Sequence, residues 1–255
     1  MPDIPEDDQE LSFLQHLVEL RSRLLKACMT IVAVLVVLLP FSRHLYETIA
    51  APMLSQMPDG SSMIAIDVAS PFLTPFKFTL LLAIMISIPM VLYQLWAFVA
   101  PALFKHEKKL ARPLLFSSVF LFYAGCAFAY FVVFPLVFGF MNRVAPEGVA
   151  VMTDISKYLD FVMTLFLAFG IAFEVPIATI LLIATGVTTT DKLASWRPYI
   201  IVGAFAIGML LTPPDVISQT LLALPMWLLF EVGIVMSRIL IKDQDAETEE
   251  AQASS

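Results

Sequence analysis

The chain has 255 residues, of which 59% are hydrophobic and 15% charged, and its formal net charge is −7 at pH 7. An ordinary soluble domain is roughly 45–50% apolar and about 25% charged, so this composition excludes a soluble globular protein and indicates an integral membrane protein. Much of the acid lies in residues 1–10 and 241–255, which we expect to be disordered tails around a single membrane domain of residues 11–240.

Residues 11–26 have the pattern of an amphipathic helix. Apolar side chains recur at positions 11, 14, 17, 18, 20, 24 and 25, and the opposite face carries His16, Glu19 and Arg23. This spacing predicts a helix lying along the membrane surface. Glu19 and Arg23 are four residues apart, which is typical of an ordinary ion pair on a helix surface. The alternative is that Glu19 accepts the guanidinium group of a binding partner.

Six apolar runs predict an all-α membrane protein with six transmembrane helices. They are residues 24–41, 76–99, 114–134, 159–184, 199–211 and 216–237. A bilayer core of roughly 30 Å needs about 20 helical residues. Between Arg197 and Pro213 the fifth run has only about fourteen residues available, roughly 21 Å, and we expect both the fifth and the sixth spans to be short. Prolines in or beside the runs predict kinks that shape a concave bundle, at Pro40, Pro89, Pro135, Pro176 and Pro225.

The distribution of Lys and Arg predicts the orientation of these spans. Eleven lie in the two terminal segments and in the loops 100–113 and 186–198, against four on the opposite side. Since cytoplasmic loops carry the excess of Lys and Arg, both termini should be cytoplasmic. The first external segment, 42–75, is long and rich in turn signals, so it should form a structured cap.

The loop 100–113 holds a single carboxylate, Glu107, within a cluster of basic residues. Those residues are Lys105, His106, Lys108, Lys109 and Arg112. In one interpretation Glu107 neutralises its neighbours through local pairs worth about 0.2–0.5 kcal/mol each. In the other it contacts a cationic peptide, and together with Glu19, predicted on the same side of the membrane, it could hold two guanidinium groups.

Glu174 is a carboxylate within an apolar run, near the predicted middle of the bilayer. Burial of an acid at that depth costs at least a few kcal/mol, which makes it a candidate functional residue. Three interpretations stay open: a protonated side chain bonded to a neighbouring helix, a proton relay, or a docking point for another protein's helix. Near the external end, Asp215 is placed to cap the sixth helix, and Gln219 is polar within the sixth run.

The sequence contains no nucleotide-binding or zinc-binding motif, and Cys28 and Cys126 lie in separate apolar runs. We therefore predict no cofactor, no metal, no nucleotide, no nucleic-acid partner and no enzymatic activity. The pattern favours a receptor and assembly platform. The alternative is a proton-coupled secondary transporter using Glu174, which should have several polar groups at the bilayer midplane and internal repeats.

Six segments, in order along the chain, resemble the TatC family, the multispanning subunits of the twin-arginine protein translocase. They are HLVELRSRLL (16–25), AIDVASPFLTPFKFT (65–79), LYQLWAFVAPALFKHEKK (92–109), FAYFVVFPL (128–136), FEVP (173–176) and GMLLTPPDVISQTLLALPMWLLFEVG (208–233).

The resemblance implies a six-span receptor in the bacterial inner membrane that binds signal peptides with paired arginines. It further implies assembly with single-span TatA-like and TatB-like subunits, contacts with lipids and with further copies of itself, and export of folded cargo by the proton motive force. The signal-peptide positions that match are Glu19, Arg21, Phe98 and Glu107. The partner-helix positions are Glu174, Met209, Thr212 and Gln219, and those of the external cap are Pro52 and Asp215.

Overall fold

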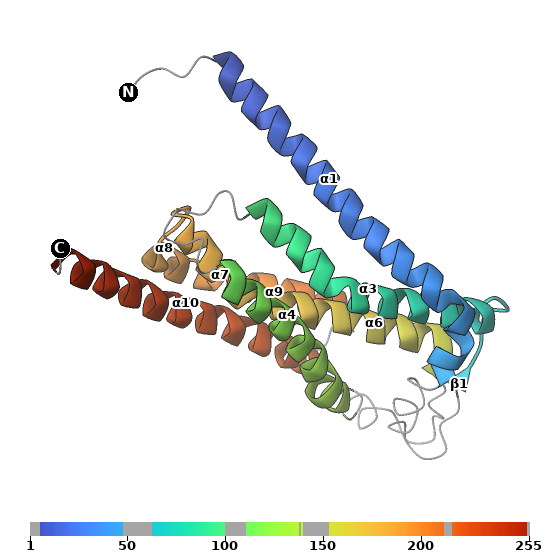
Figure 1. Cartoon of the computed structure of the whole chain (residues 1–255). Helices are drawn as coiled ribbons and strands as arrows, with labels where there is room; N and C mark the ends of the chain where they lie inside the picture. The colour runs from blue at the N-terminus through green and yellow to red at the C-terminus, as the bar shows by residue number, and fades with distance from the viewer. Residues whose placement is uncertain are drawn as a thin grey trace.

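The computed structural model describes residues 6–47, 63–99, 111–137, 139, 153–211 and 216–253, and these form a helical bundle (Figure 1). The elements in chain order are α1 (Glu6–Leu38), η1 (Leu39–Phe41), β1 (Met63–Ile64), α3 (Ser70–Val99), α4 (Ala111–Phe128), η4 (Ala129–Val133), β2 (Thr153–Asp154), α6 (Ile155–Ala172), α7 (Val175–Ala184), α8 (Thr190–Ser195), α9 (Arg197–Leu211) and α10 (Val216–Ala253). The predicted all-α architecture is confirmed.

Five helical stretches in the described part of the chain are long and apolar enough to cross a membrane. They are Gln15–Glu47, Ser70–Val99, Arg112–Val137, Ile155–Ala184 and Gln219–Ile239. A sixth apolar helix, Arg197–Leu210, is shorter, as predicted for the fifth span. The apolar stretch of the sixth span has 21 residues and is the shortest of these five, and α10 is not interrupted at Pro225.

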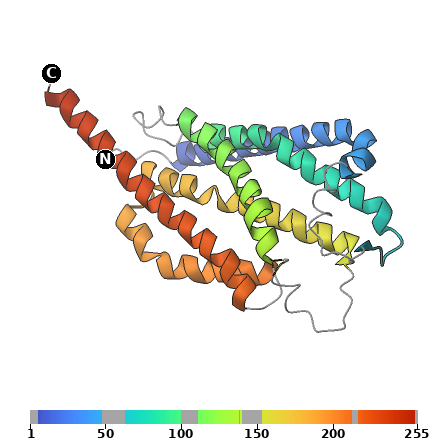
Figure 2. The ribbon, with the colours of Figure 1, turned by 90° about the horizontal axis from the view of Figure 1, so that it is seen from below.

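The bundle has two distinct ends (Figures 1 and 2). The N-terminal end of α1, the short helix α8 and the C-terminal end of α10 lie at one end, here called the tail end. The strands β1 and β2 lie at the other, here called the cap end, where they pair in parallel with Met63 opposite Thr153. This pairing joins two segments that are far apart in sequence, and the residue pattern did not predict it.

The predicted surface helix and the first span form one continuous helix, α1, because residues 6–38 contain neither proline nor glycine to interrupt it. Helical structure also enters both segments that were expected to be disordered. α1 begins at Glu6, and α10 continues to Ala253 through a segment rich in Ala, Glu and Gln, which favour helices.

Three of the five prolines predicted to kink helices coincide with interruptions. Pro40 lies in the 3₁₀ turn η1, and Pro135 follows the π-helical segment η4. Pro176 lies in the first turn of α7, just after the turn at Phe173 and Glu174 that divides the fourth span into α6 and α7. Proline is tolerated in a first helical turn because the N–H it lacks would have no intrahelical partner there.

Pro89 lies inside α3 without interrupting it. A proline at this position cannot donate to the carbonyl group of Met85, four residues earlier. The hydroxyl group of Tyr123 in α4 donates to that carbonyl oxygen at 2.7 Å. A side chain from a neighbouring helix therefore replaces the missing backbone bond.

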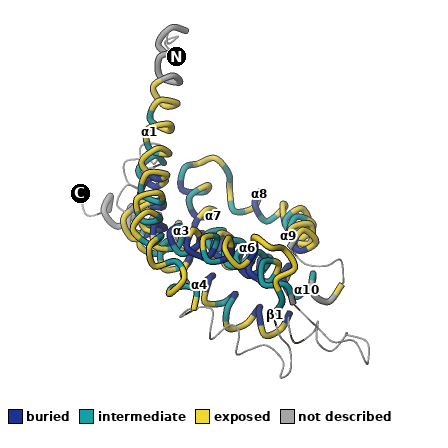
Figure 3. Tube along the Cα trace, turned by 90° about the vertical axis from the view of Figure 1, so that its right-hand side faces the viewer, coloured by how far each residue is buried: buried dark blue, intermediate teal, exposed yellow. Residues whose placement is uncertain are grey.

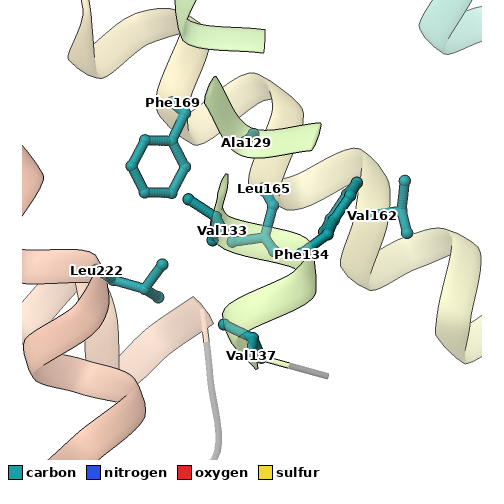
Figure 4. Packing of buried hydrophobic residues seen from close by; sticks show 8 residues of the cluster. All are labelled: Ala129, Val133, Phe134, Val137, Val162, Leu165, Phe169 and Leu222. Atoms are coloured by element: carbon teal, nitrogen blue, oxygen red, sulfur yellow. The ribbon is translucent and has the colours of Figure 1, made fainter. Parts of the chain in front are cut away.

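The largest buried cluster lies where α4, η4, α6 and α10 meet (Figure 4). Its members are Ala129, Val133, Phe134, Val137, Val162, Leu165, Phe169 and Leu222. α4 and α6 approach closely beside it, because a Cβ atom at Gly125 would clash with the carbonyl oxygen of Phe169. Many residues on the outside of the helices are exposed (Figure 3). A large number of them are large and apolar, as expected of a surface in contact with lipid.

Candidate functional site

A small groove lies between α1 and α3 toward the tail end. It is lined by Leu20, Arg23, Leu24 and Ala27 of α1 and by Val91, Gln94, Leu95 and Phe98 of α3. On each helix these residues are spaced i, i+3, i+4 and i+7, which places them on one helical face. We call this groove, of about 150 Å³, the α1–α3 notch.

Glu19 lies at the tail-end edge of the notch and is bonded to Arg23. The guanidinium group donates from Nε at 3.2 Å and from Nη2 at 2.9 Å, both to Oε1 of Glu19. The predicted ion pair is therefore present. The Glu19 side chain remains 38% exposed and that of Arg23 26% exposed. Arg23 also donates from Nη1 to Oε1 of the buried Gln94 at 3.4 Å, which ties α1 to α3.

A ring pair closes the tail end of the notch. The rings of His16 and Phe98 stack with centroids 4.3 Å apart and planes 24° apart. Phe98 is half-buried, and Arg21 is exposed on α1. The structure thus places Phe98 beside the N-terminal part of α1, on the same side of the bundle as Glu19. Glu107 lies outside the described residues, so its distance from Glu19 stays a prediction.

Glu174 belongs to a chain of hydrogen bonds across three helices. The indole Nε1 of Trp96 in α3 donates to Oγ of Ser118 in α4 at 3.3 Å, and that hydroxyl donates to Oε2 of Glu174 at 2.5 Å. Trp96 and Ser118 are both buried. The other carboxylate oxygen, Oε1, is buried and has no hydrogen-bond partner among the described residues. This site can therefore accept one further hydrogen bond.

Sequence reasoning missed Ser118 and Trp96 as functional candidates. Serine in an apolar run is common, and tryptophan is frequent near the ends of membrane spans. The available signal was that both lie in predicted spans, where a polar side chain needs a partner.

The predicted partner-helix residues lie on α9 and α10. Met209 is exposed on α9, and Gln219 is half-buried near the start of α10. The helices approach here, since a Cβ atom at Gly208 would be 3.4 Å from the carbonyl oxygen of Gln219. Thr212, Asp215 and Pro52 lie outside the described residues.

Two ion pairs hold the tail-end parts of α8, α9 and α10 together. Arg197 at the start of α9 donates through Nε and Nη2 to the two carboxylate oxygens of Glu231, at 2.5 and 2.8 Å. Arg238 lies 3.7 Å from Asp191 of α8. The short helix α9 is thereby fixed to α10 by a bidentate pair.

Asp154 organises the cap end. Its carboxylate accepts the backbone N–H of Ile66 at 3.0 Å, and it caps α6 by accepting those of Ser156 and Lys157. The bond from Ile66, followed by that from Lys157, lowers the pKa of Asp154 below its ordinary value. One side chain therefore joins the segment around β1 to the start of α6.

The described residues contain no group of three or more His, Cys, Asp and Glu side chains placed to hold a metal ion. An apolar groove of about 350 Å³ indents the bundle between α6, α7, α9 and α10. The arrangement as a whole offers carboxylates and apolar grooves for binding.

Comparison with known proteins gives consistent matches over nearly the whole chain. The family model described as Sec-independent protein translocase protein (TatC) matches residues 15–225. The chain is 54% identical over 246 residues to the protein of that name from Azotobacter chroococcum, covering 96% of both. It is 59% identical over 231 residues to the one from Haemophilus influenzae, covering 91% of this chain and 90% of that protein. A crystal structure titled as the twin arginine translocase receptor TatC superposes with a TM-score of 0.78 at 38% identity, covering 88% of this chain and 98% of that one.

Proposed function

Because the chain belongs to the TatC family and is thus a multi-pass subunit of a Sec-independent protein translocase, we propose that it is the subunit that receives the signal peptide. In this proposal it binds signal peptides with paired arginines at the cytoplasmic face of the bacterial inner membrane. It then acts as the core of the complex that exports folded proteins with the energy of the proton motive force.

The observation that carries the proposal is the carboxylate of Glu19 at the edge of the α1–α3 notch. Both bonds from Arg23 go to Oε1, and within the described part of the chain Oε2 accepts none. An incoming guanidinium group can bind Oε2, or it can displace Arg23, which then keeps its bond to Gln94. Arginine suits this site better than lysine because its planar group presents two parallel donors to a carboxylate.

The remaining family positions complete the proposal. Glu107 supplies the second carboxylate, and Arg21 and Phe98 flank Glu19. TatA-like and TatB-like single-span subunits dock on α9 and α10 through Met209, Thr212 and Gln219, with Glu174 as a further contact. Pro52 and Asp215 belong to the external cap.

The orientation follows from the positive-inside rule. The tail end, with both termini, faces the cytoplasm because eleven of the fifteen Lys and Arg residues lie in the segments assigned to that side. Glu19 then faces the compartment in which signal peptides are made. The alternative of a proton-coupled transporter has less support. A proton relay needs a chain of ionisable groups, whereas Glu174 is bonded to the hydroxyl group of Ser118, which is bonded in turn to the indole of Trp96.

The test is the affinity of membrane vesicles for an Arg-Arg signal peptide after Glu19→Gln and Glu107→Gln. A hydrogen bond to a charged group contributes about 1.5–3 kcal/mol, so each variant should bind roughly tenfold or more weakly. Glu47→Gln, an exposed acid near the cap end, is the matched control and should bind normally. Unchanged affinity in both variants would contradict the assignment.

A further inference from the structure

We infer that Ser118, itself oriented by Trp96, is a positioning residue that fixes the orientation of the Glu174 carboxyl group. The inference rests on the proposed function, in which Glu174 contacts a partner helix, and makes it more specific. It assigns a role to a serine of α4 and a tryptophan of α3, which are not among the family positions given above.

The hydroxyl group of Ser118 is bonded differently from most other hydroxyl groups in this bundle. Six others in the described residues donate to the backbone carbonyl group four residues earlier, and they belong to Thr30, Thr79, Thr164, Thr185, Thr220 and Ser237. The Ser118 hydroxyl instead donates across to Oε2 of Glu174 at 2.5 Å. A hydroxyl group has only one hydrogen to donate, so Ser118 forms this bond in place of the local one.

Trp96 explains the direction of the serine hydroxyl. An indole N–H group can only donate, so Oγ of Ser118 is the acceptor in the bond from Trp96. The serine hydrogen then needs an acceptor of its own, and within the described structure the one bonded to it is Oε2 of Glu174. The chain of bonds therefore runs in one direction, from indole to hydroxyl to carboxyl oxygen. When the carboxyl group carries a proton, that proton accordingly lies on Oε1.

The Glu174 side chain is not held by its own helix. Glu174 is the N-cap residue of α7, but its side chain makes no capping bond there. Asp154, the N-cap residue of α6, in contrast accepts two backbone N–H groups of its helix. Among the described residues, Ser118 is the one donor to the Glu174 carboxyl group. The orientation of this group therefore depends on a bond from α4.

The chain of bonds lies in apolar surroundings. Trp96 is buried in a cluster with Leu114, Ile177, Ile180 and Ala184, and Ser118 is 1% exposed. Hydrogen bonds are stronger in such surroundings than in water, and a buried acceptor has little access to water that would replace a lost donor. Removal of the serine hydroxyl should therefore change the bonding of the carboxyl group.

The first experiment observes the Glu174 carboxyl group directly, in membranes that contain the full complex. Its infrared band is isolated as the difference between each protein and the same protein carrying Glu174→Gln. Ser118→Ala should shift this band, because Oε2 loses its hydrogen bond. Trp96→Phe should shift it less, because the hydroxyl remains but loses the bond that orients it. The test thus does not depend on the folding of a single variant.

Ser117→Ala is the matched control. Ser117 precedes Ser118 in α4, but it is only half-buried and is not bonded to Glu174. Its replacement should leave the Glu174 band in place. The inference is overturned if the band stays in place in Ser118→Ala, or if it shifts as far in Ser117→Ala. A band that Trp96→Phe leaves unchanged would overturn the orienting role of Trp96.

The second experiment tests whether Ser118 acts through Glu174. A crosslinking residue at Ile171, which is 65% exposed and lies three residues before Glu174, reports contact with the single-span partner. Ser118→Ala should lower this crosslinking about two- to tenfold, the effect expected from one hydrogen bond. In a Glu174→Ala background the same change should lower it no further. Equal losses in both backgrounds would show that Ser118 does not act through Glu174.

The outcomes separate the two proposals. If Ser118→Ala shifts the band but neither Ser118→Ala nor Glu174→Ala lowers the crosslinking, the positioning role stands and the proposed contact of Glu174 with a partner helix fails. If Glu174→Ala lowers the crosslinking but Ser118→Ala does not shift the band, the contact stands and the inference fails.

Discussion

Three carboxylates differ in what they are bonded to, and their bonding partners indicate what each can do. Glu19 shares one oxygen with the guanidinium group of a partly exposed arginine. Glu174 accepts from a buried serine hydroxyl and has one buried oxygen without a partner in the described structure. Asp154 accepts backbone N–H groups from two segments. The first is suited to exchange with a ligand, the second to one added hydrogen bond, and the third to holding the fold.

For Glu174 we predict that Glu174→Gln keeps much of the transport of an Arg-Arg cargo, whereas Glu174→Ala loses more. Glutamine retains an oxygen that can accept from Ser118 and a group that can bond a partner helix, an interaction worth about 0.6–2 kcal/mol in membranes. Alanine retains neither. The measurement is cargo transport into inverted vesicles, with crosslinking to the single-span partner. A protonation role would be favoured if the Glu174→Gln variant transported as little cargo as the wild type does without a proton gradient, while its crosslinks to the partner remained intact.

For Asp154 we predict a pH-dependent attachment of the segment around β1. Because its folded-state pKa is lowered, its contribution to stability is complete above the ordinary carboxyl pKa of about 3.9 and is lost as pH falls through the lowered value. Amide exchange of residues 63–69, corrected for intrinsic rates, should therefore accelerate in acid. Asp154→Asn should remove most of this pH dependence and Asp67→Asn, the nearby control, should not. Identical profiles for wild type and Asp154→Asn would contradict the assignment.

The sequence identified candidate residues by charge and the local Glu19–Arg23 pair by its spacing, but not the partners of Glu174. Glu19, Glu107 and Glu174 stand out because a carboxylate in a cationic or apolar segment is unusual. Ser118 and Tyr123 do not stand out, since their roles depend on which turn of α4 faces Glu174 and Met85. That contact is set by packing between helices, which no local pattern specifies.

At the level of the elements, a proline within an apolar run does not by itself interrupt the helix. Pro89 lies in an unbroken α3 because Tyr123 donates to the carbonyl oxygen of Met85. Pro176, in contrast, coincides with the division between α6 and α7 that places Glu174 at a turn. The sequence pattern predicted a kink at both prolines. The donor that compensates for Pro89 belongs to another helix, so it cannot be recognised from the residues around the proline.

We predict that Tyr123→Phe lowers the free energy of unfolding by about 1 kcal/mol, since it leaves the carbonyl group of Met85 unpaired in an apolar surrounding. In a Pro89→Ala background the same change should cost clearly less, because the alanine introduced there supplies the missing N–H. The free energies of unfolding of the wild type, the two single variants and the double variant are compared by thermal or denaturant unfolding in detergent. Tyr93→Phe, at an exposed position of α3, is the control. Equal losses in both backgrounds would show that Tyr123 does not compensate for the proline.

At the level of the whole molecule, the two ends of the bundle serve different purposes. The cap end is held by a short strand pair and by Asp154, whereas the tail end combines the α1–α3 notch with two ion pairs around α9. Hydropathy was sufficient to predict the five long apolar helices because lipid requires about 20 apolar residues for each crossing. Hydropathy could not predict the strand pairing, which depends on contact between distant segments. It also could not predict the continuity of α1, which depends on the absence of a helix-breaking residue.

We propose that paired arginines are recognised at the tail end of α1. A photocrosslinking residue at Leu20, exposed beside Glu19, tests it in nucleotide-free vesicles, with the same residue at exposed Val36 near the cap end as control. We predict crosslinks from position 20 to a labelled Arg-Arg peptide, removed by excess unlabelled Arg-Arg peptide but not by Lys-Lys peptide, and few from position 36. Equal crosslinking from both positions, or equal competition by the two peptides, would contradict the account.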